Sequence, residues 1–229
     1  MADPDPTDLD ALIARVDPDR WLSSRFISDA QARGDVITIY AFDYELARAP
    51  RVATNPLMGE IRLTWWREVL DEVFDGRIVR QHPTAQALAA VINRHRLPRG
   101  ALEALVDARY RELDAKPMNL PDALAWAEGT GGTVATLCAQ ILDPTAHMIL
   151  AKSGGQAWSI GMLMGTAGLT GNEAQAALQT ALGGSQGLSV TAFPAVAHAT
   201  LARQRAKGQR PGPLKARLLI LWAVLRGRV

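Results

Sequence analysis

The residues with the clearest chemical potential are two opposite charges on apolar helix faces. At about 100° per residue, Asp43 falls in the apolar stripe of its helix, and Arg62 falls among the apolar residues of the next one. An unpaired charge is costly in an apolar interior, so the sequence predicts that Asp43 pairs with Arg62, with Tyr40 as a further hydrogen-bond donor. Two interpretations stay open: a structural buried ion pair, or polar groups that face a cavity and take a ligand headgroup.

Other chemical signals are few. The four histidines are isolated in sequence and lack metal-like spacing, and the glycine motifs of nucleotide sites and the G-x-S-x-G motif are absent. Cys138, the single cysteine, excludes an internal disulfide and is interpreted as a buried, inert thiol. Four carboxylates between residues 68 and 75 lie opposite an apolar stripe and are assigned to a solvated face. The sequence therefore predicts no metal site.

The elements that must position these residues are helices. Apolar residues recur at helical spacing almost throughout, and no strand-like alternation persists. The spacing and the proline and glycine breaks predict the following helices: 8–16, 30–48, 56–75, 84–94, 99–113, 121–142, 145–166, 172–182, 193–207 and 214–226. With 229 residues, 48% of them hydrophobic, the chain is long enough for one substantial core. We expect an all-α, single-domain bundle.

Charge divides the chain unevenly. Through Thr130 there are 16 basic and 21 acidic residues, whereas the remainder has nine basic residues and only two acidic ones, Asp143 and Glu173. The basic end predicts affinity for an anionic membrane surface or an acidic partner protein. Nucleic acid is not expected because stacking aromatics are scarce there, and a solvated basic terminus is the plain alternative. The residues assigned to this surface are Arg203, Arg205, Lys207, Arg210, Lys215, Arg217, Trp222, Arg226 and Arg228.

The last segment, residues 214–229, joins eight consecutive apolar residues to basic flanks. It is too short to cross a bilayer, so it either lies in the membrane interface or closes the bundle as a final core helix. The first ten residues carry four aspartates and no signal-peptide pattern. The expected location is cytoplasmic, with peripheral attachment to the inner face of the cytoplasmic membrane as a further expectation.

Several motifs, taken in order, resemble the squalene/phytoene synthase family of the isoprenoid synthase fold. They cover roughly residues 20–166, and each is short. The segments are Ser23-Ser24-Arg25-Phe26, Arg33, Tyr40-Ala41-Phe42, Glu60-Ile61-Arg62-Leu63 with Trp65-Trp66-Arg67, His82-Pro83, the run from Trp126 to Val134, and Gly155-Gln156-Ala157-Trp158. The resemblance implies a central cavity, with Ser24, Arg25, Arg33, Tyr40, Asp43 and Arg62 as its ligand-binding candidates. It also implies an N-terminal arm over residues 1–19, a synthase-like bundle over 20–192 and C-terminal helices over 193–229.

Both aspartate-rich motifs that bind magnesium in active members of that family are missing. The first would fall at Ala47 and Arg48, and the second would follow Trp158, where residues 159–166 contain no carboxylate. Asp43 and Glu45 do not substitute for the first motif because they point about 200° apart on a helix. No catalytic residue and no cofactor are therefore expected.

The resemblance then implies a non-catalytic protein similar to the family branch that includes a mitochondrial assembly factor for respiratory complex I. Such a protein would bind lipid or assist assembly at a membrane surface. The alternative is an active head-to-head prenyltransferase that condenses two prenyl diphosphates, with magnesium or with arginines in its place. A helical module that binds no lipid and catalyses nothing is the third interpretation.

Overall fold

The computed structural model describes residues 8–51, 55–114, 116–166 and 169–229. These residues form helices and connecting segments, and no strand occurs among them. The predicted all-α class and isoprenoid synthase fold are confirmed. The first seven residues of the expected N-terminal arm lie outside the described residues.

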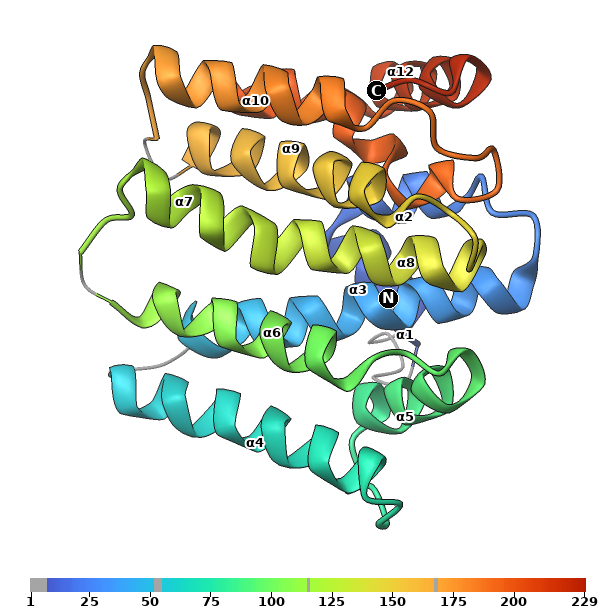
Figure 1. Ribbon diagram of the computed structural model, residues 1–229, viewed down its shortest axis with the longest axis vertical. Coiled ribbons are helices and arrows are strands. Elements are labelled where there is room, and N and C mark those ends of the chain that lie inside the picture. Colours follow the sequence, from blue (N-terminus) through green and yellow to red (C-terminus); the bar gives the residue numbers. More distant parts are fainter. Residues whose placement is uncertain (1–7, 52–54, 115, 167–168) are drawn as a thin grey trace, which may run out of the picture.

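The helices lie side by side as a layered bundle (Figure 1). Contacts run from α10 (Asn172–Gly184) to α9 (Met148–Thr166), then to α7 (Leu120–Ala127) and α8 (Thr133–Leu142), and on to α6 (Arg99–Tyr110) and α4 (Pro56–Phe74). The remaining α-helices are α1 (Leu9–Val16), α2 (Pro18–Ser24), α3 (Ala30–Arg51), α5 (Pro83–His95), α11 (Ala202–Ala206) and α12 (Pro213–Arg226). Short turns of other helical types are η1 (Arg111–Leu113), η2 (Glu128–Gly132), η3 (Phe193–Ala195) and η4 (Ala197–Leu201).

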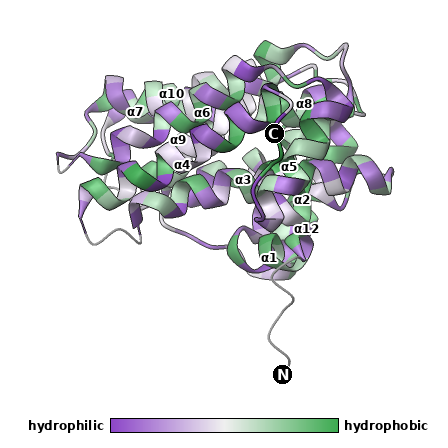
Figure 2. Cartoon of the chain, turned by 90° about the horizontal axis from the view of Figure 1, so that it is seen from below, coloured by the Kyte–Doolittle hydropathy of each residue, from purple (hydrophilic) through white to green (hydrophobic). Residues whose placement is uncertain are grey.

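The core runs through the whole described chain. Buried apolar side chains extend from Ile13 in α1 to Ala223 in α12, and α3 carries a long series of them between Val36 and Ala49. Hydrophobic and hydrophilic residues form separate stripes along many of the helices (Figure 2). The domain boundaries at 19/20 and 192/193 stay a prediction. Buried residues lie close to each boundary: Ser23 to the first and Phe193 to the second.

Two departures from the predicted helices affect the site. The helix α2 was not expected because Asp17-Pro18 resembles a break, but Asp17 caps α2 through a hydrogen bond from the Arg20 amide at 3.2 Å, and Pro18 fits its first turn. The predicted helix 193–207 is instead two 3₁₀ turns followed by the short α11. Most of its buried apolar residues nevertheless belong to the main core, and Ala202 belongs to a smaller second cluster with Ile160 and Leu178.

The crossing of η2 and α9 is unusually close. A Cβ atom on Gly155 would lie 1.9 Å from the Gly131 carbonyl oxygen, so glycine is required for this approach. The π-helical turn η2 lies within residues 126–134, one of the segments that resemble the family. This crossing brings Thr130 and Gly131 to a central cavity that α9 also lines.

Candidate functional site

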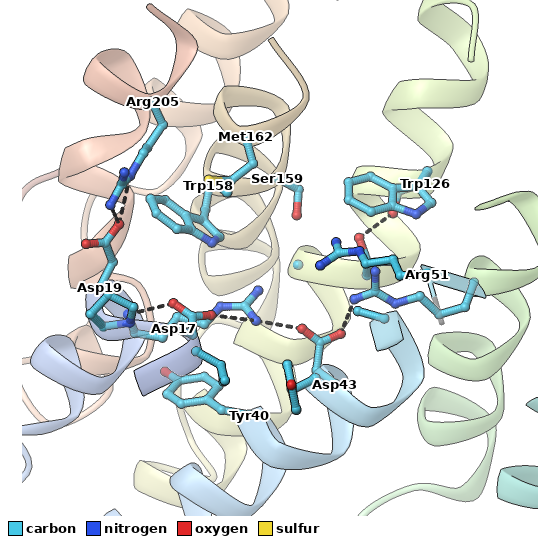
Figure 3. A pocket seen from close by; sticks show the side chains of 18 of the residues that line it. Asp17, Asp19, Tyr40, Asp43, Arg51, Trp126, Trp158, Ser159, Met162 and Arg205 are labelled. Carbon is cyan, nitrogen blue, oxygen red and sulfur yellow. Dashed lines mark hydrogen bonds and ion pairs between the residues drawn. The ribbon is translucent and has the colours of Figure 1, made fainter. Parts of the chain in front are cut away.

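A central cavity of about 210 Å³ lies among α2, α3, η2, α9 and α11, and Figure 3 shows its side chains. It adjoins an outer cavity of about 640 Å³, and both cavities are lined by Val16, Arg51, Trp126, Met162 and Arg210. Ligand sites usually measure about 300–1,000 Å³, so a ligand of ordinary size would have to occupy both. The charged residues that line the inner cavity are Asp17, Asp19, Arg20, Asp43, Arg51, Arg109, Arg205 and Arg210.

Asp43 lies between two buried arginines. Arg20 Nη1 donates to Asp43 Oδ2 at 2.6 Å, and Arg109 Nη2 donates to Asp43 Oδ1. Arg109 Nη1 also donates to Glu112 Oε1 at 2.6 Å. All three side chains of the Arg20–Asp43–Arg109 cluster are at most 8% exposed. Burial opposes ionisation of Asp43, but Arg109 and Arg20 outweigh it and lower its pKa to about 2.

The predicted pairing of Asp43 with Arg62 is wrong. Arg62 lies in a different hollow, beside Glu45 and Arg48, and Glu45 points to another side of α3 from Asp43. A helical wheel gives the direction of each side chain from its own helix, but it does not show which neighbour packs on that side. Tyr40 does not join the pair either: its hydroxyl is buried without a hydrogen-bond partner in the described part of the chain.

Asp19 forms a second buried pair, with Arg205. The guanidinium donates through both Nε, at 2.8 Å, and Nη2 to Asp19 Oδ2, and it lies 5.9 Å from the Trp158 ring centroid. The assignment of Arg205 to the outer basic surface is therefore wrong. The cause is the tight packing of α11 on α9, where a Cβ atom on Gly165 would lie 2.0 Å from the Arg205 carbonyl oxygen.

The remaining carboxylate of the cavity, Asp17, has its Oδ2 3.6 Å from Arg20 Nη1. All three cavity carboxylates thus face an arginine, and all three come from α3, α2 or the residue that caps α2. The opposite wall presents Trp158, Ser159 and Met162, and α9 contains no carboxylate.

This donor set does not fit the magnesium ions that the fold family implies. Magnesium requires carboxylate oxygens that are available to it, and here arginines hold them on one side of the cavity. No group of three or more His, Cys, Asp or Glu side chains that could hold a metal occurs within the described residues.

The other predicted cavity residues lie outside this cavity. Ser24 Oγ donates to the Trp21 carbonyl at 2.7 Å, Arg25 pairs with Asp10 at 2.5 Å, and Arg33 donates to the Ile27 carbonyl at 2.9 Å. Of the six candidates, only Tyr40 and Asp43 line the central cavity.

Sequence reasoning missed Arg20 and Arg109. A signal for Arg109 was present, because it follows Leu102, Leu105 and Val106 at i+7, i+4 and i+3 on the buried face of α6. Arg20 lies in the helix that was not expected. Cys138 is buried as predicted, and burial raises the pKa of its thiol to about 12.

A second candidate surface is α12. Its core side consists of Ala216, Ile220 and Ala223, so the helix does close the bundle. The opposite side exposes five large apolar residues, each at least 41% exposed: Leu214, Leu218, Leu221, Trp222 and Leu225. At about 100° per residue this outer stripe is bordered by Arg217 on one edge and by Lys215 and Arg226 on the other. Every other residue of the predicted basic surface except Arg205 is also exposed.

Fold and cavity together define an all-helical protein of the isoprenoid synthase fold whose central carboxylates lie beside arginines. The sequence matches the squalene/phytoene synthase family over residues 13–167, and the chain belongs to that family. Among solved structures it is similar to a dehydrosqualene synthase in complex with ligand, at a TM-score of 0.75 and 11% identity, over 95% of this chain and 94% of that one. It is also similar to squalene synthase HpnC from Alicyclobacillus acidocaldarius, at a TM-score of 0.59 and 15% identity, over 97% and 94%.

Curated relatives carry a different name. Complex I assembly factor 6 of Homo sapiens is 27% identical over 132 residues, and that of Bos taurus is 26% identical over the same length. Each match covers 57% of this chain and 39% of the relative. The chain thus spans well under half the length of the curated relatives it matches.

Proposed function

We propose that this protein is a non-catalytic member of its family that acts as an assembly-type factor for a respiratory complex at a membrane surface. One observation carries the non-catalytic part: on the described cavity wall Asp19 and Asp43 pair with arginines, and burial raises the pKa of Asp17, which lies 3.6 Å from Arg20, so these residues offer a metal no group of free carboxylates. The departure of a diphosphate group requires its charge to be neutralised, and the family does this with carboxylate-bound magnesium. In this chain the carboxylates Asp19 and Asp43 of the cavity pair with arginines of the protein itself and are therefore not available to magnesium.

The relatives support the assembly part of the proposal. The similar synthases share the fold at 11% and 15% identity, whereas the sequence matches at 24–27% identity are named assembly factors of NADH dehydrogenase complex I. A family scaffold without the metal site can present its outer surface to a partner and needs no turnover to do so.

The α12 stripe supports a membrane location. An exposed leucine and tryptophan row between cations is the pattern of a helix that lies in a lipid interface, with its cations at the phosphates. No carboxylate occurs after Glu173, so two copies of this face would repel one another, whereas an anionic bilayer complements it. No described helix is long and apolar enough to cross a membrane.

Two experiments test the proposal. The purified protein, incubated with farnesyl or geranylgeranyl diphosphate and magnesium, is expected to form no condensed hydrocarbon. Steady product formation would overturn the non-catalytic assignment and favour the prenyltransferase.

Deletion of the gene is expected to lower NADH:quinone oxidoreductase activity in isolated membranes and the amount of assembled complex on native gels. Restoration by the wild-type chain is the control. A deletion strain with normal amounts of the complex would overturn the assembly role. It would favour the interpretation of this protein as a helical module that has no such function.

A further inference from the structure

A second hollow, of about 320 Å³, lies between α3, α4 and the start of α5. It shares no lining residue with the central cavity, so it is a separate site. Its polar and aromatic lining consists of Glu45, Arg48, Arg62, Trp65, Trp66 and His82. The volume is within the range of small-molecule sites.

Two buried nitrogen atoms in this lining lack partners. Arg62 Nη1 and His82 Nδ1 are both inaccessible to solvent and have no hydrogen-bond partner among the described residues. Folding normally avoids this arrangement, because a buried donor or acceptor that gains no partner loses its hydration without compensation. Because the Arg62 side chain as a whole is only partly buried and lines the hollow, its guanidinium can turn toward a ligand there that supplies the missing acceptor.

The charges favour an anion. Arg48 and Arg62 bring two positive charges, while Glu45 brings one negative charge. Glu45 Oε2 lies 3.6 Å from Arg48 Nη1, too far for a good hydrogen bond. The two guanidinium groups can thus turn hydrogen atoms toward a third group.

The aromatic wall favours a ligand with an apolar body. The Trp65 and Trp66 rings meet edge to face at 4.9 Å, and His82 packs edge-on against both, at 5.6 and 5.4 Å between centroids. Trp66 also packs against Phe42 in the core, which fixes the wall in place. Rigid aromatic side chains provide contact area at a low entropic cost.

We propose that this hollow binds a small organic anion, a carboxylate or phosphate on a short aromatic or apolar body. The anionic group accepts hydrogen bonds from Arg62 and Arg48, and the body lies against Trp65 and Trp66. His82 Nδ1 either accepts from a hydroxyl of the ligand or donates to its anionic group. The site is independent of the proposed assembly function.

Calorimetric titration with 1-naphthoate and with 1-naphthyl phosphate tests this proposal, with neutral 1-naphthalenemethanol as the comparison. At least one anion is expected to bind about tenfold more tightly than the neutral alcohol, because a charge-assisted hydrogen bond contributes about that factor. Tighter binding of one anion than the other identifies the anionic group. Equal affinity for the alcohol, or no saturable heat with either anion, would overturn the proposal.

Arg62→Gln is expected to weaken binding of the preferred anion about tenfold or more. The matched control is Arg67→Gln on the same helix, which lies outside the lining and is expected to keep the wild-type affinity. Loss of affinity in both variants, or in neither, would contradict the assignment.

Stability separates ligand binding from a structural role. Arg62→Met is expected to abolish anion binding while the melting temperature stays at or above that of the wild type, because it removes a buried nitrogen atom that has no partner among the described residues. If Arg62→Gln fails to fold, Arg48→Gln replaces it, because Arg48 is half exposed and its loss leaves the core intact. An unchanged affinity in Arg48→Gln would then count against the site.

Discussion

At the residue scale, the buried charges of the central cavity depend on one another. Asp43 receives a hydrogen bond from Arg20 on one oxygen and from Arg109 on the other, while Glu112 provides the additional negative charge beside Arg109. A buried charge that loses its partner is not rehydrated, so removal of the central carboxylate costs more than the pair itself contributes.

Asp43→Ala is therefore expected to lower the free energy of unfolding by about 3–5 kcal/mol, since it leaves two buried arginines around a vacant centre. Urea unfolding followed by circular dichroism measures the loss. Asp107→Ala, which breaks an exposed pair with Arg67, is the control and is expected to cost less than about 1 kcal/mol. A cost below that limit in Asp43→Ala would show that the cluster is hydrated.

The low pKa of Asp43 predicts a specific pH dependence. Its pKa of about 2 in the folded state lies below the value of about 3.9 expected in the unfolded chain, so its ionisation stabilises the fold above pH 3.9. This stabilisation is lost as pH falls through the folded pKa. The stability gap between wild type and Asp43→Asn is expected to narrow by about 1 kcal/mol between pH 6 and pH 3. The free energy of unfolding of each protein is measured by urea unfolding at each pH. A constant difference between wild type and Asp43→Asn from pH 6 to pH 3 would contradict the assigned pKa.

The inward direction of Asp43 could be predicted from sequence, but its partners could not. Helical periodicity gives a side chain's angle about its own axis: Asp43 is buried at the central cavity, whereas Arg62 is only partly buried and lines a separate hollow. Which helix packs opposite depends on tertiary arrangement. Arg20 reaches Asp43 only because α2 exists, and the only sequence signals for α2 were the aspartate cap and proline that resembled a break.

At the scale of elements, most helices could be placed from sequence because their apolar spacing is long and regular. The predicted segments 30–48, 56–75 and 172–182 correspond to α3, α4 and α10 with shifts of at most three residues at an end. The segment 193–207 was less predictable because many of its residues are small and apolar. Its 3₁₀ turns η3 and η4 are buried on most sides, so their apolar residues show no helical periodicity. The Asp19–Arg205 pair follows from that packing.

The close crossing of η2 and α9 makes a second prediction at this scale. Gly155→Ala is expected to destabilise the protein by about 1–3 kcal/mol, because its methyl group meets the Gly131 carbonyl and the backbone must separate. The control is Gly183→Ala near the end of α10, where a Cβ atom meets nothing within 4 Å and stability is expected to stay constant or rise. Similar melting temperatures for the two variants would contradict the close approach.

At the scale of the whole molecule, charge and exposed apolar surface coincide at one end. The part through Thr130 carries a formal charge of −5 and the remainder +7, and the basic remainder includes the leucine stripe of α12. An anionic bilayer would therefore attract the basic and apolar face of α12. The electrostatic part of this attraction falls with salt, whereas the insertion of leucine side chains does not.

Flotation with vesicles that contain phosphatidylglycerol is expected to recover the protein at low salt and progressively less as salt increases. Leu218→Glu with Leu225→Glu is expected to weaken vesicle binding by at least about tenfold, because each leucine loses its transfer from water and gains a repelled charge. Ile78→Glu with Ile149→Glu replaces two exposed apolar residues away from α12 and is the matched control, expected to float like the wild type. Equal flotation of the two double variants would show that another face meets the membrane, since both add two negative charges and only one removes the stripe.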